Sequence, residues 1–190
     1  MILYMIRHGE SEANIGGFYG GWDPVPLTER GRAQAVRVGE KLQALPIRRV
    51  LTSDVARAVQ TCALALPGRA YETCELLREI SVGSLAGQDK TECARRYGEE
   101  YLRRIREQDY TAYGGENREL LTARAACFFA YAETLPEDTV AAFTHEQLMK
   151  AAFRRVTGGP WPGERLLCAN TCVAAFERTG SGWRLIGWNI

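Results

Sequence analysis

The sequence predicts an α/β fold, a three-layer sandwich with a mostly parallel central sheet, helices on both faces and an antiparallel edge. Short apolar runs typical of strands buried on both faces alternate with segments of helical periodicity. Near the C-terminus, two strand-like runs are joined by Thr-Gly-Ser-Gly, the pattern of a closing hairpin. The chain has 190 residues, of which 46% are hydrophobic and 25% charged, as in ordinary globular proteins. We therefore expect residues 1–190 to form a single domain.

The first half of the chain contains two strand-helix pairs. A helix is predicted from Thr28, a residue suited to the N-cap, because apolar residues recur every three or four positions up to Pro46. Ser53 and Asp54 are predicted to cap the second helix, whose buried stripe is expected to be Val55, Val59, Cys62 and Leu66. The predicted elements are a strand at 2–6, a glycine-rich loop at 16–26, a helix at 28–46, a strand at 49–52 and a helix at 53–66.

The second half begins with a charged segment. Residues 88–113 hold many charges around a few apolar side chains, which predicts a largely exposed helical excursion from the central layers. In the helix predicted at 116–135, Leu120 and Leu135 are among the residues expected to pack in the core. The further predicted elements are a helix at 116–135, a strand at 139–144, a helix at 146–156 and strands at 171–177 and 183–188.

Composition excludes several classes of function. A net charge of +1 is too small for a surface that binds nucleic acid, and no segment has the length of a membrane span. The N-terminus lacks the basic region and long apolar region of a secretion signal. The six cysteines are scattered without a CxxC pair, and the two histidines form no HxxH spacing. We expect a cytoplasmic protein with reduced cysteines, no metal, and no nucleic-acid or membrane partner; the oligomeric state stays open.

Both histidines of the chain, His8 and His145, come directly after predicted strands. In open α/β sheets, ligands bind in the crevice outside the carboxyl ends of the strands, so neighbouring parallel strands would bring both imidazoles to one rim. Arg7 adjoins the first histidine, and Arg57 lies in the first turn of a helix, where free amides favour an anion. Two guanidinium groups can hold the oxygens of a phosphoryl group in a bidentate manner.

A phosphoryl transfer at this rim needs a nucleophile and an acid. A neutral imidazole is a good nucleophile near pH 7, provided that a partner on its other nitrogen fixes the tautomer. The departing alkoxide needs a proton from a carboxyl group whose pKa is raised by burial or by nearby anions. On the residues alone, Glu79 and Glu10 are equal candidates for that acid.

The segment Arg7-His8-Gly9-Glu10-Ser11-Glu12-Ala13-Asn14 resembles the RHG motif that opens the histidine phosphatase superfamily, which has the phosphoglycerate-mutase-like fold. The resemblance covers nearly the whole chain and continues through residues 26–34, 52–61, 77–87, 114–116, 143–145 and 170–172. It implies phosphoryl transfer to a histidine and then to water or a second acceptor, without a metal or an organic cofactor.

The resemblance also implies roles for single residues. By position, it assigns His8 as nucleophile, Glu79 as proton donor, Arg7, Arg57 and His145 as residues around the phosphoryl group, and Ser11 and Asn14 as pocket residues.

The sequence departs from the family pattern at two places. Glu146 stands where glycine is usual, and because a carboxylate is costly beside a phosphate we expect it to point outward. The loop from Ile15 to Gly20 lacks an arginine that is often present, which predicts a wider or more mobile entrance.

We expect a phosphatase that acts on a small phosphate monoester. One alternative is a phosphotransferase of the phosphoglycerate-mutase type, although the chain is short for the insertions of those enzymes. The other is a non-catalytic protein that binds a phosphate ligand on the same fold. The charged stretch from Lys90 to Arg106 is expected to lie over the rim of the site, where it could select an anionic alcohol.

Overall fold

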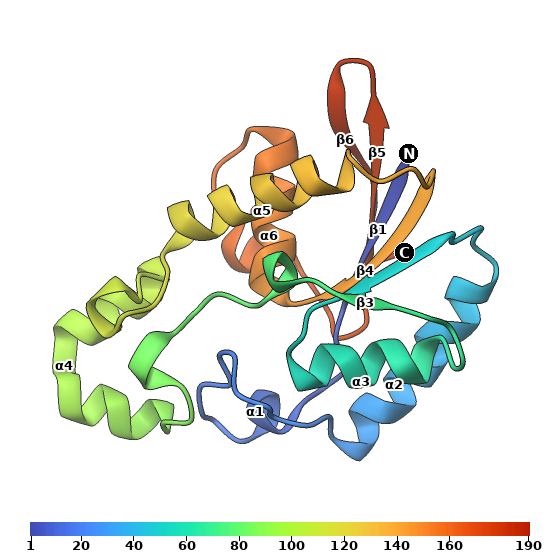
Figure 1. The fold of residues 1–190 in the computed structure, drawn as a ribbon. Helices are drawn as coiled ribbons and strands as arrows, with labels where there is room; N and C mark the ends of the chain where they lie inside the picture. Colours follow the sequence, from blue (N-terminus) through green and yellow to red (C-terminus); the bar gives the residue numbers. More distant parts are fainter.

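The computed structural model describes residues 1–190 and has a six-stranded sheet as its central layer (Figure 1). The strand order is β3-β2-β4-β1-β5-β6. The first four strands in this order run parallel, β5 runs antiparallel to β1, and β6 antiparallel to β5. The strands are β1 Ile2–Arg7, β2 Arg49–Thr52, β3 Glu72–Thr73, β4 Thr139–Thr144, β5 Val173–Thr179 and β6 Gly182–Trp188. The predicted α/β fold with a mostly parallel sheet and an antiparallel edge is confirmed.

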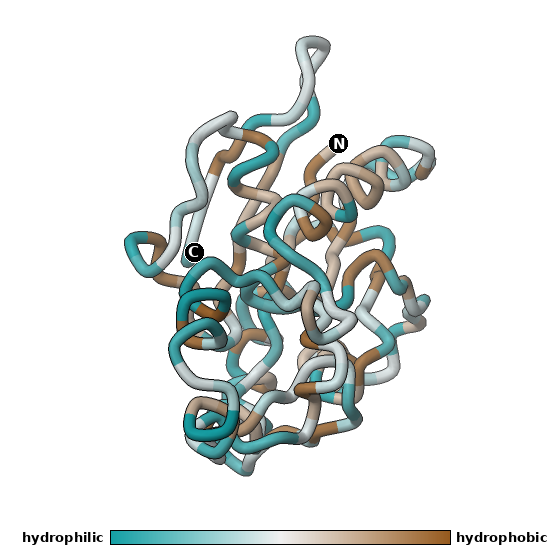
Figure 2. The backbone as a smooth tube through the Cα atoms, turned by 90° about the vertical axis from the view of Figure 1, so that its left-hand side faces the viewer, coloured by the Kyte–Doolittle hydropathy of each residue, from teal (hydrophilic) through white to brown (hydrophobic).

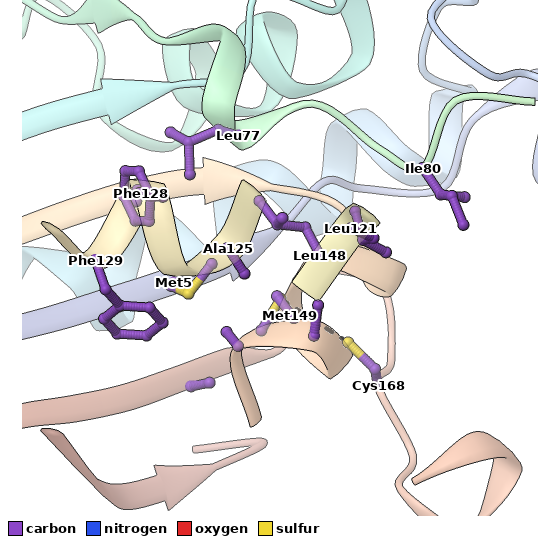
Figure 3. Packing of buried hydrophobic residues seen from close by; sticks show 14 of the residues in the cluster. Met5, Leu77, Ile80, Leu121, Ala125, Phe128, Phe129, Leu148, Met149 and Cys168 are labelled. Carbon is purple, nitrogen blue, oxygen red and sulfur yellow. Dashed lines mark hydrogen bonds between the residues drawn. The ribbon is translucent and has the colours of Figure 1, made fainter. Parts of the chain in front are cut away.

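Helices cover both faces of this sheet (Figure 1). The pair α2 and α3 packs on one face with a core cluster that includes Leu42 and Phe143. The pair α5 and α6 packs on the other face with the larger cluster, and Figure 3 shows Phe128 and Phe129 of α5 beside Met5 of β1. The helices are α1 Glu12–Ile15, α2 Glu29–Gln43, α3 Ala56–Ala65, α4 Lys90–Glu107, α5 Arg118–Ala132 and α6 Glu146–Thr157.

The central strands are buried on both faces, as their apolar runs predict. Every residue of β4 is buried. In β1, Leu3 and Met5 belong to the larger core, whereas Ile6 belongs to the cluster under α2 and α3. Figure 2 shows hydrophobic segments alternating with hydrophilic ones along the chain, and no helix has the length and apolar character needed to cross a membrane.

The structure corrects the predicted start and stripe of α3. The N-cap is Val55 rather than Ser53 or Asp54, and the helix buries Arg57. Val59 and Leu66 are only half-buried. Successive helical residues differ by about 100° around the axis, so turning Arg57 inward rotates the predicted apolar stripe partly outward.

One further expectation is wrong, and one short strand was not predicted. Leu120, expected in the core, is 51% exposed on α5. Strand β3 was not predicted, because its two residues have exposed side chains and no apolar pattern. It pairs with β2 at the edge of the sheet.

The charged segment forms α4, which arches away from the helical layers (Figure 1). Asp89 caps its N-terminus by accepting a hydrogen bond from the Glu92 amide at 2.8 Å. Its two parts meet at a kink at Gly98, whose φ of 67° suits glycine. Most of its surface is charged, but Tyr101 is buried and anchors the helix to the larger core. The excursion is thus tied down beside the carboxyl ends of the strands.

Candidate active site

The carboxyl ends of β1 and β4 bring the two histidines together. These strands are parallel neighbours, with Arg7 paired to Thr144, so His8 and His145 leave the sheet side by side. Their ring centroids lie 5.1 Å apart with the planes inclined at 61°. Both residues are buried.

The imidazole ring of His8 is held in one orientation by the backbone. Its Nδ1 lies 2.6 Å from the carbonyl oxygen of Gly9. A carbonyl only accepts, so Nδ1 carries the hydrogen and the lone pair resides on Nε2. Burial lowers the pKa of His8 well below its usual value, and the charges of Arg57 and Arg7 lower it further. The Gly9 carbonyl is the orienting partner that the sequence did not identify.

Arg57 faces His8 from the start of α3. Its Nε donates to His8 Nε2 at 3.2 Å, and its Nη2 donates to the carbonyl oxygen of Gly21 at 2.8 Å. Its Nη1 is buried and has no partner. Burial lowers the pKa of Arg57, yet a guanidinium group stays charged near neutral pH.

Arg7 approaches from the end of β1. Its Nη1 donates to the carbonyl oxygen of Cys168, and its Nη2 lies 3.0 Å from Glu146 Oε2. The third nitrogen, Nε, is buried and has no partner.

His145 also has one ring nitrogen without a hydrogen-bond partner. Its Nε2 lies 3.0 Å from the Ser53 hydroxyl, whereas its buried Nδ1 has no partner. Burial lowers the pKa of His145 well below its usual value, with Arg57 adding to the effect. Buried polar atoms are nearly always hydrogen-bonded in proteins. The unpartnered Arg7 Nε and Arg57 Nη1 belong to residues that line one cavity with His8, and they therefore indicate a place for a ligand rich in acceptor oxygens. His145 is buried beside His8 and does not line this cavity.

Glu79 lines the cavity that contains His8, which has a volume of about 350 Å³. Its Oε1 accepts hydrogen bonds from the amides of Ile80 at 3.0 Å and Gln147 at 3.1 Å. Burial raises the pKa of Glu79, Arg57 opposes the rise, and Glu146 adds to it. The carboxyl group thus stays protonated to higher pH than an ordinary glutamate.

A partly buried ion pair that sequence reasoning missed holds the Glu79 segment. Arg124 of α5 donates to the carbonyl oxygens of Arg78 at 2.6 Å and Glu79 at 2.9 Å, and to Glu116 Oε2 at 2.7 Å. Glu116 in turn accepts from the Ser81 amide at 2.8 Å. The resemblance included the segment 114–116, but no pattern in the sequence pointed to Arg124.

The remaining sequence candidates lie at different depths. Asn14 lines the cavity, and its Oδ1 accepts from the amide of Ser11 at 3.0 Å. Ser11 itself is buried beneath it, at the N-cap of α1. Glu10 accepts from the Thr28 hydroxyl at 2.9 Å and lines a separate cavity on the outer side of Arg7. Of the two candidate acids, the structure places Glu79 in the cavity with His8.

The expectation that Glu146 points outward is wrong. Glu146 lines both the cavity that contains His8 and the outer one, and its carboxylate lies 3.0 Å from Arg7 Nη2 and 2.6 Å from Lys150 Nζ. These two cations offset the charge whose proximity to a phosphate was expected to exclude it.

Backbone hydrogen bonds connect the glycine-rich loop at the entrance to the segment before α4. Tyr19 of the glycine-rich loop exchanges backbone hydrogen bonds with Gln88 at 3.0 Å and Gly87 at 2.8 Å. The loop is therefore tied to the segment that leads into α4. The excursion adds Lys90, Ile105 and Gln108 to the cavity wall. No group of three or more His, Cys, Asp or Glu side chains is placed to hold a metal ion.

Comparison with known proteins identifies the family of this site. The chain is 36% identical over 142 residues to 2,3-bisphosphoglycerate-dependent phosphoglycerate mutase 2 of Gloeobacter violaceus, covering 72% of this chain and 64% of the relative. It is 48% identical over 69 residues to adenosylcobalamin/alpha-ribazole phosphatase of Salmonella typhimurium, covering 36% of this chain and 34% of the relative. The matches thus span less than two thirds of the length of either relative.

A solved structure matches over almost its full length. The alpha-ribazole phosphatase from Shigella flexneri has a TM-score of 0.88 and 25% identity, covering 100% of this chain and 96% of that one. The profile of the histidine phosphatase superfamily (branch 1) matches residues 3–190. With paired imidazoles after β1 and β4, Arg7 at the end of β1 and Arg57 at the start of α3, the chain belongs to the histidine phosphatase superfamily.

Proposed function

We propose that the protein is a phosphatase that hydrolyses a small phosphate monoester through a phosphohistidine on His8. The observation that carries this proposal is the set of buried, unpartnered nitrogens on Arg7, Arg57 and His145 around a neutral imidazole. A phosphoryl group supplies the acceptor oxygens that the two arginine nitrogens lack, and the arginines supply positive charge where negative charge develops.

In the first step, His8 Nε2 attacks the phosphorus atom and forms a P–N bond while the ester P–O bond breaks. The Arg57 Nε that now donates to His8 Nε2 is free to turn its hydrogen bond to a phosphoryl oxygen. The leaving alcohol oxygen takes the proton of Glu79, whose pKa burial raises above that of an ordinary glutamate. The products of this step are the free alcohol and phosphohistidine.

In the second step, water attacks phosphorus and the P–N bond breaks. Glu79, now a carboxylate, accepts a proton from the attacking water, and the electron pair of the broken bond returns to His8 Nε2. Inorganic phosphate leaves, and the starting state is restored. The hydrogen bond from His8 Nδ1 to the Gly9 carbonyl keeps the ring in one tautomer throughout.

The names of the relatives include a mutase and phosphatases, which differ in the acceptor of the phosphoryl group. Similarity to an alpha-ribazole phosphatase over the whole chain supports hydrolysis. The presence of Glu146 in the cavity adds support, because a mutase acting on phosphoglycerate must also bind a carboxylate close to the phosphate. Transfer to a second alcohol remains the alternative to be tested.

We propose that residues 1–190 act as one domain, with residues 88–113 as an excursion that completes the cavity. Residues from Arg7 to Gln147, including some from the excursion, line the same cavity, which supports a single domain. All six cysteines are free thiols, which supports a reducing compartment such as the cytoplasm. The net charge of +1 supports a small-molecule rather than a nucleic-acid partner.

The test is phosphate release from a panel of phosphorylated metabolites by the wild-type and His8→Ala proteins. We expect the wild type to release phosphate and to carry an acid-labile, base-stable phosphoryl label after rapid quenching. His8→Ala should lose both, because no other residue in the cavity can take the phosphoryl group. If His8→Ala keeps a tenth of the wild-type rate, the nucleophile is wrongly assigned. If a labelled wild type transfers phosphate to an alcohol rather than water, the mutase alternative holds.

A further inference from the structure

We propose that Glu146 selects the chemical class of the substrate. Monoesters whose alcohol carries a neutral or cationic group beside the ester are accepted, whereas those with a carboxylate or a second phosphate there are rejected. This inference rests on the proposed phosphatase function and goes beyond it, because phosphoryl transfer through His8 requires no particular alcohol.

Glu146 is placed to act on the part of the substrate next to the phosphoryl group. It is the first residue of α6, directly after His145, and its side chain is 25% exposed. It lines the cavity that contains His8 and also the outer cavity, of about 450 Å³, on the other side of Arg7. The carboxylate therefore stands at the boundary of the two cavities, beside the guanidinium group that faces the reacting phosphate.

The contacts of Arg7 show what this carboxylate changes. Nη1 is committed to the Cys168 carbonyl and Nη2 to Glu146, so only Nε is left for a ligand. Glu146 also engages Lys150 at 2.6 Å, and that lysine is therefore not free for a ligand. The carboxylate thus reduces the positive charge around the phosphate by one unit and occupies the donors of two cations.

A single phosphoryl group can still take hydrogen bonds from the unpartnered Arg7 Nε and Arg57 Nη1, and it still meets the charge of Arg57. A second anionic group on the neighbouring carbon would find no free donor, because the nearby arginine nitrogens bind protein atoms or the phosphate. Such a group would face Glu146 at short range in a partly buried site. At an effective dielectric constant of about 20, repulsion between like charges about 6 to 12 Å apart lowers affinity by roughly ten- to a hundredfold.

The rest of the cavity wall has a different character. It presents Ile80, Val82, Ile105 and Tyr110 together with Lys90, whose Nζ lies 5.5 Å from the centre of the Tyr19 ring. No carboxylate forms an ion pair with Lys90. A remote anionic group on a longer substrate can therefore be met there. The selection by Glu146 concerns the atoms next to the ester and not the charge of the whole molecule.

The test compares glycerol 3-phosphate with 3-phosphoglycerate, which differ in one group, a hydroxymethyl in the first and a carboxylate in the second. Turnover is measured as kcat/KM, and binding of both esters is measured separately on the His8→Ala protein, which holds the ester without consuming it. Glu146→Gln removes the charge and keeps the size of the side chain, with one oxygen that can accept from either Arg7 or Lys150. Glu164→Gln is the matched control, because Glu164 lines only the outer cavity.

We expect the wild type to prefer glycerol 3-phosphate by about tenfold or more in kcat/KM, and Glu146→Gln to reduce this preference about tenfold. His8→Ala should show the same preference in binding, and Glu146→Gln in that background should reduce it. Glu164→Gln should leave the ratio within twofold of wild type. Thermal unfolding checks that each variant is folded, and Glu146→Gly provides a second variant without the carboxylate.

A preference that Glu146→Gln and Glu146→Gly leave unchanged, while phosphate esters still bind and turn over, overturns this inference alone. An equal effect of Glu164→Gln overturns it as well, since the discrimination would then follow the general charge of the surface. If neither ester binds to any variant, the proposed phosphatase function fails and this inference fails with it.

Discussion

Replacing Glu79 by glutamine removes a proton while preserving the shape of the side chain. The amide oxygen can still accept the hydrogen bonds that Oε1 receives from Ile80 and Gln147, so the fold of the segment should persist. Losing the acid should slow a substrate with a poor leaving group by roughly 10²- to 10⁴-fold, or about 3 to 5 kcal/mol of activation free energy. We expect a much smaller loss for an aryl phosphate, whose leaving group needs little protonation.

The assay follows the rate of phosphohistidine formation for one alkyl and one aryl phosphate in rapid-quench experiments. The pH profile gives a second readout. Because burial raises the pKa of Glu79, the wild-type rate with the alkyl ester should fall as pH rises through that raised value. Glu79→Gln should lack this descending limb. Phosphohistidine should also accumulate in the variant, since water attack loses its base.

Glu10→Gln is the matched control, because that carboxylate contacts Thr28 and faces the outer cavity. We expect it to leave the ratio of the two substrates unchanged. Equal, small losses for both substrates in Glu79→Gln would refute the assignment of Glu79. A large loss confined to Glu10→Gln would make Glu10 the acid instead.

Three further outcomes follow from the site. Arg124→Met should lower the free energy of unfolding by about 3 kcal/mol in denaturant titrations, because it leaves the largely buried Glu116 without its ion-pair partner. It should also slow hydrolysis of the alkyl ester more than hydrolysis of the aryl ester. Equal slowing of both would mean that Arg124 has only a structural role. Chelators should not change the rate, since Arg7, Arg57 and the imidazoles supply the charge and donors; activity lost in EDTA and restored by a divalent ion would count against the mechanism. The folded-state pKa values of the two buried histidines lie well below the ordinary 6.5. Their stabilising contribution is therefore present above pH 6.5 and is lost as the pH falls below it. His145→Asn should weaken this pH dependence of the free energy of unfolding, and an unchanged dependence would contradict the argument.

The sequence determined the layers of this protein because they depend on patterns between near neighbours. Apolar runs such as Thr139–Thr144 can be buried on both faces, and helical periodicity follows from residues three or four apart. The hairpin of β5 and β6 is local for the same reason. β3 escaped prediction because two exposed residues carry no such pattern.

The candidate site was predictable to the extent that strand ends are predictable. His8 and His145 each follow an apolar run, and parallel pairing of those runs places them together. The choice between Glu79 and Glu10 was open on the residues alone. It depends on which cavity each side chain enters, and that is set by how segment 75–81 lies across the sheet.

The sequence by itself therefore determined the fold class, the motif around His8 and the set of residues able to transfer a phosphoryl group. Only the tertiary structure decided that Glu146 turns into the cavity and that Arg124 holds the Glu79 segment. Both outcomes depend on charges from different elements: Arg7 of β1 meets Glu146 of α6, and Arg124 of α5 reaches the carbonyls of Arg78 and Glu79. A buried charge takes the position where opposite charge and hydrogen bonds compensate its lost hydration, and those partners are brought together only by the folded chain.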